Sequence, residues 1–123
     1  MISNILKSIL AISVLIFMNS SVHAELVNCG EHTILDIATE SNRDDQGPFA
    51  NTFNFRLTDD GTSQYLCRGR GTFYISDTSN AYNSIASTIL AAFLSGKKII
   101  VYINDSNTKG TTGYEIALIN IMK

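Results

Sequence analysis

The clearest pattern of hydrophobic and polar positions lies at residues 49–57. Asn54 and Arg56 point to one side of this segment, and the apolar side chains that point to the other side are Phe49, Phe53, Phe55 and Leu57. Successive side chains of a strand face opposite ways, so the alternation predicts a half-buried antiparallel strand. An Asp-Gly pair within residues 58–61 supplies the positive-φ positions of a tight turn and predicts a hairpin there.

Four other segments have the composition of strands. Residues 33–40 are β-branched and partly alternating, and a short strand at 26–28 can precede them. A third strand is predicted at 64–75, where Gly69 and Gly71 indicate a bulge or a sharp bend. The fourth and fifth strands are predicted at 97–104 and 113–122, with a polar loop at 105–110 between them.

One helix is predicted between the third and fourth strands. Side-chain oxygens at Asp77, Thr78 and Ser79 can cap its start, and Gly96 can end it. No residue from 78 to 96 is charged, and the apolar arc is about twice as wide as a surface helix needs. The helix is therefore expected to pack on its own core and against a second surface as well. The alternative is a small domain that tolerates a weakly polar helix.

The predicted order is three strands, one helix and two strands. A mainly β chain with this order matches the five-stranded Greek-key barrel of the OB fold. Closing the sheet also limits the exposed edges of such a β-rich chain.

The first 24 residues have a different character from the rest. Lys7 is their only charge, an apolar run follows, and the segment ends in Val22-His23-Ala24. Small residues at the third and first positions before the cut, here Val22 and Ala24, are typical of a signal-peptide cleavage site. We therefore expect a signal peptide at 1–24 and one domain at 25–123. The protein is then secreted or periplasmic, with no membrane span after cleavage. An N-terminal membrane anchor is the alternative.

The net charge and the number and spacing of the cysteines argue against some classes of function. The mature chain carries eight basic and eleven acidic side chains, a formal charge of −3, and this balance argues against a nucleic-acid binder. Cys29 and Cys67 both lie in the exported part, where one disulfide is expected, and the chain-entropy model gives such a bridge about 4 kcal/mol. The cysteines and His32 do not have metal-ligand spacing, so neither a metal nor a cofactor is predicted.

Residues 81–104 resemble a known family. A helix ending in Leu94-Ser95-Gly96, followed by the strand Lys97-Lys98-Ile99-Ile100-Val101-Tyr102, is similar to the binding subunits of pentameric bacterial AB toxins, in the subtilase-cytotoxin and typhoid-toxin branch. The resemblance implies a homopentamer, an enzymatic A subunit as partner and glycan binding on the barrel. The helix residues expected at the oligomer interface are Tyr82, Ile85, Ile89 and Phe93.

Candidate sugar contacts come from tyrosines on strands and from polar turns. Tyrosine rings can stack on sugars, and asparagine and serine side chains can hydrogen-bond sugar hydroxyls. The candidate glycan-binding residues are Ser41, Asn42, Tyr74, Tyr102 and Asn104. Tyrosines on strands are also common packing residues, and Asn- and Ser-rich segments are ordinary turns, so the structural reading stays open.

No catalytic motif is present, and we expect no enzyme. His32, with Glu31 and the pair Arg68 and Arg70, could form the acid–base site of a small exported ribonuclease. Glu31 and His32 are explained equally well as polar residues that lead into a strand. The leading hypothesis is an exported, non-catalytic toxin subunit that binds host cell-surface glycans as a homopentamer. The alternative is a secreted or periplasmic OB-like accessory protein that binds a protein or small ligand, with no toxin role.

Overall fold

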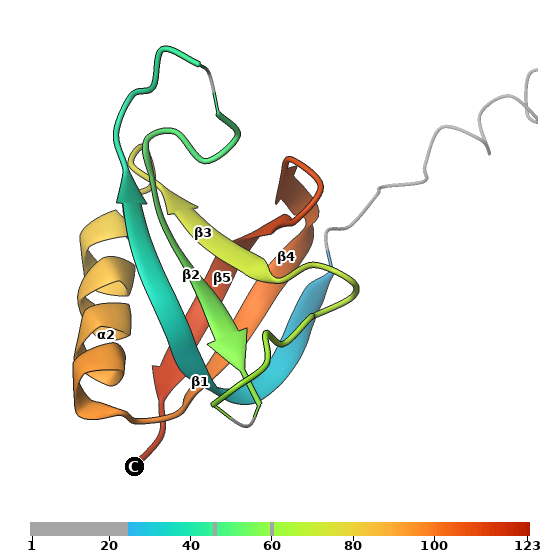
Figure 1. Cartoon of the computed structure of the whole chain (residues 1–123), viewed down its shortest axis with the longest axis vertical. Coiled ribbons are helices and arrows are strands. Elements are labelled where there is room, and N and C mark those ends of the chain that lie inside the picture. The colour runs from blue at the N-terminus through green and yellow to red at the C-terminus, as the bar shows by residue number, and fades with distance from the viewer. Residues whose placement is uncertain (1–24, 46, 60) are drawn as a thin grey trace, which may run out of the picture.

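The computed structural model describes residues 25–45, 47–59 and 61–123, and the predicted signal peptide lies outside them. Within these residues the chain forms five strands and one helix (Figure 1). In chain order they are β1 (Leu26–Glu40), β2 (Thr52–Thr58), β3 (Thr72–Ser76), α2 (Tyr82–Ser95), β4 (Ile99–Lys109) and β5 (Gly113–Ile121). The predicted mainly β class and the predicted order of elements are confirmed.

The five strands form one sheet whose hydrogen bonding closes on itself. The order around the ring is β1, β2, β3, β5 and β4, and β4 pairs again with β1. All neighbours are antiparallel except β3 and β5, which are parallel. Each half of β1 has a different partner, because its first residues pair with β4 and its last residues pair with β2.

Residues 26–28 are in a strand, as predicted, but they are continuous with the following strand and form the start of β1. The pairing register with β4 shifts between Asn28 and Glu31, around Gly30. Gly30 has a φ of +84° and its amide donates to Asn28 Oδ1 over 2.7 Å. Glycine adopts positive φ without steric cost, so the strand bends here and continues.

The third strand is shorter than predicted, since β3 begins at Thr72 rather than near residue 64. Before β3, the chain makes only isolated antiparallel β-bridges. Gln64 pairs with Thr58, and Cys67 pairs with Arg70 across a tight turn. Arg68 and Gly69 occupy that turn with φ of 47° and 79°. These left-handed residues interrupt the ladder that the apolar pattern had suggested.

The polar loop predicted at 105–110 is also wrong, because β4 continues to Lys109. Thr108 pairs with Tyr114 and Lys109 with Gly113, after a register shift that follows Asn104. β5 occupies Gly113–Ile121, as predicted to within one residue. Strand pairing at Thr108 and Lys109 therefore extends β4 through a segment whose composition alone is typical of a loop.

The core lies between the sheet and α2. Strand residues such as Phe55, Leu57 and Phe73 are at most 1% exposed, and α2 contributes Ile85, Ile89 and Ala92. Gly96 ends the helix in a left-handed conformation, as predicted. The start differs from the prediction: the helix begins at Tyr82, and its N-cap Ala81 has no side-chain cap, although the Ser79 hydroxyl accepts the Ala81 amide over 3.2 Å. In the described residues no helix is long and apolar enough to cross a membrane.

The predicted disulfide is confirmed. Cys29 of β1 is bonded to Cys67 in the turn before β3, with their Cα atoms 5.6 Å apart. Both cysteines are buried. The bond ties the bent part of β1 to a segment that is otherwise held by isolated bridges, and such bonds persist in oxidising compartments.

Candidate functional site

A polar pocket of about 380 Å³ opens where β3 approaches the turn between β4 and β5. Its lining residues are Tyr74, Ser76, Ser106, Asn107, Thr108, Lys109 and Glu115. The parallel pairing of β3 with β5 sets Tyr74 opposite Glu115. The register shift after Asn104 leaves residues 105–107 outside the β4–β5 ladder, and two of these residues line the pocket.

Tyr74 is the aromatic residue of the pocket lining, and it is largely buried. Its ring meets Phe49 edge-on at a centroid distance of 6.0 Å, and Lys109 Nζ lies 5.6 Å from its centroid. Burial, reinforced by the nearby Glu115 carboxylate, raises the pKa of Tyr74 to about 12, although Arg70 opposes the shift. The phenol therefore keeps its proton at neutral pH and can both donate and accept hydrogen bonds.

The polar side chains of the pocket are held by one another. Asn107 Nδ2 donates to Glu115 Oε2 over 3.0 Å. Asn104 Oδ1 accepts the Ser106 amide over 3.1 Å and the Ser106 hydroxyl over 2.7 Å. Donors and acceptors are thus presented at fixed positions, with the opposite charges of Lys109 and Glu115 in the same wall. Such a site suits an uncharged ligand that carries several hydroxyl groups.

The five predicted glycan contacts are only partly brought together. Tyr74 lines the pocket. Asn104 does not line it, but its Oδ1 accepts the hydroxyl of the lining residue Ser106. Tyr102 lies elsewhere on β4, where its hydroxyl accepts Asn28 Nδ2 over 3.4 Å. Ser41 and Asn42 are exposed in the connection after β1 and do not line the pocket.

Sequence reasoning missed Ser76, Lys109 and Glu115 as pocket residues. The composition of residues 105–108, rich in Asn and Ser, was the available signal and pointed to the correct segment. Nothing in the local sequence places Glu115 beside Tyr74, because that neighbourhood depends on the parallel pairing of β3 with β5.

His32 belongs to a separate, buried cluster beside the disulfide. Its Nε2 lies 2.6 Å from the Cys29 carbonyl oxygen, to which it donates, and its ring stacks on Tyr65 at 3.7 Å. Its Nδ1 lies 2.7 Å from Asp59 Oδ1 without making a hydrogen bond. The side chain is thus held through Nε2 and one ring face, which is the arrangement of a packing residue.

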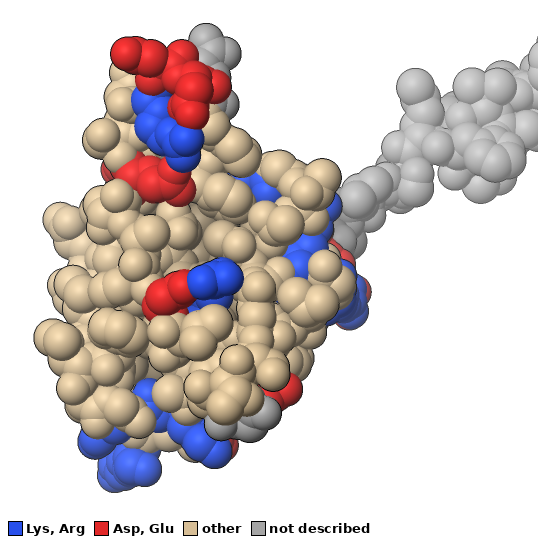
Figure 2. Space-filling view, in the orientation of Figure 1, with Lys and Arg blue, Asp and Glu red and all other residues tan. Residues whose placement is uncertain are grey.

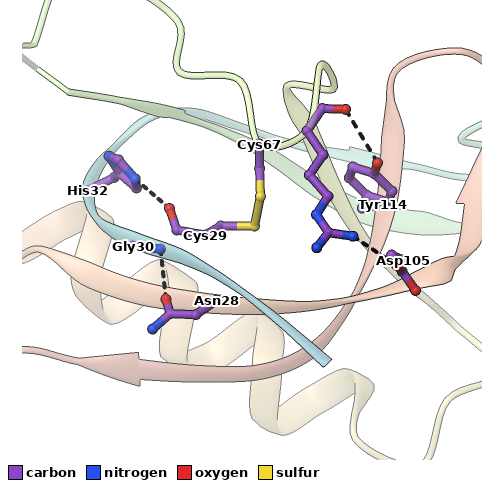
Figure 3. The surroundings of a disulfide bond; sticks show 8 residues. Asn28, Cys29, Gly30, His32, Cys67, Asp105 and Tyr114 are labelled. Carbon is purple, nitrogen blue, oxygen red and sulfur yellow. Dashed lines mark hydrogen bonds and ion pairs between the residues drawn. A yellow bond between two sulfur atoms is a disulfide. The ribbon is translucent and has the colours of Figure 1, made fainter. Parts of the chain in front are cut away.

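The two arginines considered with His32 are also engaged. Arg68 Nη1 contacts Asp105 Oδ2 at 3.0 Å, and Arg70 Nη1 donates to the carbonyls of Gly110 and Gly113. Figure 3 shows His32 and Asp105 on opposite sides of the disulfide, so the Arg68 contact and the His32 cluster are separate. Among the described residues, no group of three or more His, Cys, Asp or Glu side chains could hold a metal ion.

The predicted interface residues of α2 lie on two different faces. Ile85 and Ile89 point into the core and are 8% and 0% exposed, so they leave almost no surface for a partner. Tyr82 packs against the core from a half-buried position, whereas Phe93 is 38% exposed. The apolar surface that α2 presents outward is formed by Leu90, Phe93 and Leu94, of which only Phe93 was among the predicted interface residues.

Charged side chains are sparse over the face shown in Figure 2. They lie on the connection after β1, near the end of α2 that leads to β4, in one acid–base pair in the middle of the face and along the edge where β1 begins. On that connection Arg43 pairs with Glu40 and Asp45. No basic stripe crosses this face.

Comparisons with models of protein families, with curated proteins and with solved structures find no match for this chain.

Proposed function

We propose that this protein is an exported, non-catalytic carbohydrate-binding domain of the OB type, and that it binds sugars in the Tyr74 pocket. The observation that carries the proposal is the pocket itself. It combines the buried Tyr74, which is 3% exposed, with hydroxyl, amide, amine and carboxylate groups. Sugar hydroxyls need hydrogen-bond donors and acceptors side by side.

The position of the pocket supports the OB assignment. OB folds bind oligosaccharides and oligonucleotides on the face of strands 2 and 3, next to the β1–β2 and β4–β5 loops. Here these two loops meet: a Cβ at Gly113 would lie 2.6 Å from the Phe49 ring, and one at Gly110 would lie 3.3 Å from Pro48. Phe49 also contacts Tyr74, so the pocket lies beside this meeting point.

The local charge favours sugars over nucleic acids. Lys109 and Glu115 have opposite charges, and the whole chain has a formal charge of −2. A nucleic-acid site of the same fold would need several unpaired basic groups to neutralise phosphates.

The proposal extends to an assembly. A homopentamer that delivers an enzymatic chain would bury the outward face of α2, formed by Leu90, Phe93 and Leu94. Light scattering on the mature protein tests this part separately, and a monomer at micromolar concentration would contradict it. Sugar binding by a monomer would instead support an accessory protein without a toxin role.

A glycan array followed by titration calorimetry tests sugar binding. We expect a glycan to bind, and we expect Glu115→Gln and Asn107→Ala to weaken its affinity by about fivefold to tenfold, because each removes one or two hydrogen-bonding groups. Asp59→Asn is the matched control, since Asp59 contacts His32 outside the pocket, and it should bind like the wild type. The proposal fails if no glycan binds, or if the pocket variants bind as tightly as the control.

A further inference from the structure

The first described residue, Glu25, is held by a pair of reciprocal contacts with Asp105. The Glu25 backbone nitrogen donates to Asp105 Oδ1 over 3.2 Å, and the Asp105 amide donates to the Glu25 carbonyl over 3.3 Å. Leu26 pairs with Asn104 in the adjacent rung of the β1–β4 ladder. The ladder thus ends with a carboxylate placed directly on the nitrogen of residue 25.

Arg68 completes this group of charges. Its Nη1 lies 3.0 Å from Asp105 Oδ2 and 3.6 Å from Glu25 Oε2. Three features fix Arg68 in place: a left-handed φ of 47°, a 3.4 Å hydrogen bond from the Tyr114 hydroxyl to its carbonyl, and the disulfide at the preceding Cys67 (Figure 3). A non-glycine residue in this conformation costs free energy, which indicates that its surroundings enforce the position.

The charges of the group do not balance in the uncut chain. One guanidinium faces the carboxylates of Glu25 and Asp105, while the Glu25 nitrogen is a neutral amide. Hydrolysis of the Ala24–Glu25 peptide bond by a signal peptidase consumes one water, leaves a carboxylate on Ala24 and leaves an ammonium group on Glu25. Two positive groups then face two negative groups.

We infer that Asp105, with Arg68, forms a binding site for the new amino terminus of the processed chain. Removal of the signal peptide converts a single amide hydrogen bond into an ion pair and fixes the start of β1 on β4. Chain termini are poorly ordered unless they are tied down in this way. The inference rests on the predicted cleavage site and is independent of sugar binding.

The ion pair has a defined pH dependence. The groups facing the ammonium are the Asp105 carboxylate from β4, the Arg68 guanidinium from the turn before β3 and the Glu25 carboxylate itself. We expect the direct contact with Asp105 to raise the pKa of the amino group above that of a free chain end. The stabilisation is then present at neutral pH, where the ammonium and the carboxylate are both charged, and it is lost as the pH rises through the raised pKa.

The first experiment measures that titration on the full mature protein. The protein is exported with its own leader, mass spectrometry confirms that it starts at Glu25, and the amino group is followed by NMR of its ¹³C-dimethyl signal. We expect a raised pKa in the wild type and an ordinary one in Asp105→Asn. Asp44→Asn, at an exposed carboxylate in the connection after β1, is the control and should leave the value unchanged. An ordinary pKa in the wild type, or a mature chain that starts elsewhere, would overturn the inference.

A second measurement does not require any variant to fold. The Tm of the mature chain is compared with that of the same chain acetylated at Glu25, at about pH 6 and about pH 10 on either side of the amino-group titration. We expect the free amino terminus to raise the Tm by about 2–5 °C at the lower pH, with a smaller difference at the higher pH. Equal Tm values at the lower pH would contradict the ion pair, and neither result depends on whether the protein binds sugar.

Discussion

Two regions of this domain differ in how they are held together and in how open they are to solvent. The disulfide region, formed by Cys29, His32, Asp59, Tyr65 and Cys67, has a covalent cross-link and buried cysteines, and its imidazole is held by the Cys29 carbonyl and the Tyr65 ring. The pocket region, formed by Tyr74, Ser106, Asn107, Lys109 and Glu115, is open and polar. It is held by strand pairing and side-chain hydrogen bonds.

This contrast suggests how a small domain keeps one region available for a ligand. Small domains bury little apolar surface and are only marginally stable. A cross-link placed away from the pocket stabilises the fold without occupying polar groups that a ligand needs. The disulfide region should therefore determine stability, and the pocket region should determine binding.

The largest effect is expected from removing the disulfide. Cys29→Ala combined with Cys67→Ala releases a loop closed over a sequence separation of 38 residues and should lower the free energy of unfolding by about 4 kcal/mol. Urea unfolding measures the loss. In conditions where the variant stays folded, its sugar affinity should equal that of the wild type. An altered affinity would show that the two regions are coupled.

The second effect concerns His32. His32→Ala removes the stacking partner of Tyr65 and leaves the buried Cys29 carbonyl without its donor, so we expect a loss of about 2 kcal/mol. Thermal and urea unfolding measure it, with Glu31→Gln as the control at the neighbouring exposed position. Unchanged stability would contradict a packing role, and a change in any activity would reopen the catalytic interpretation.

The third effect should appear in binding and not in stability. Tyr74→Phe keeps the ring against Phe49 but removes the hydroxyl, so sugar affinity should fall about fivefold to tenfold while the Tm stays within a few degrees. Calorimetric titration and thermal unfolding of the same sample measure both quantities. Normal affinity in this variant would remove Tyr74 from the site.

The smallest effect concerns a surface pair outside both regions. Hydrogen bonds from Arg56 hold the pKa of Asp36 below its usual value. A lowered pKa contributes stability that is present above the usual aspartate pKa and is lost as the pH falls through the lowered one. Both side chains are more than 40% exposed, so Asp36→Asn should change acid unfolding by less than about 0.5 kcal/mol. A larger change would contradict the small contribution expected of an exposed ion pair.

Local sequence signals predicted the features that depend on neighbouring residues. Gly96 ends the helix because a glycine adopts the left-handed conformation at little cost, and β5 follows its own alternation. The disulfide followed from two cysteines in a chain expected to be exported. Predictions failed where distant pairing decides: residues 105–109 read as a loop but belong to β4, and the turn at Arg68 shortens β3.

The candidate site shows the same division. Tyr74 and the Asn- and Ser-rich segment were recognised from their chemistry, while Tyr102, Ser41 and Asn42 share that chemistry but lie outside the pocket. Residue type gives the capacity to bind, whereas position relative to other strands decides which residues act together.

The mainly β class, the order of strands and helix, the end of the helix and the cysteine pair could all be predicted from the chain, because they follow from periodicity, turn chemistry and the presence of two cysteines. Contacts between distant residues set which face of α2 is buried and bring Tyr74 and Glu115 into one wall of the pocket. They also place Asp105 and Arg68 around the nitrogen of residue 25. These placements depend on contacts between residues far apart in the chain, and no local pattern encodes such distances.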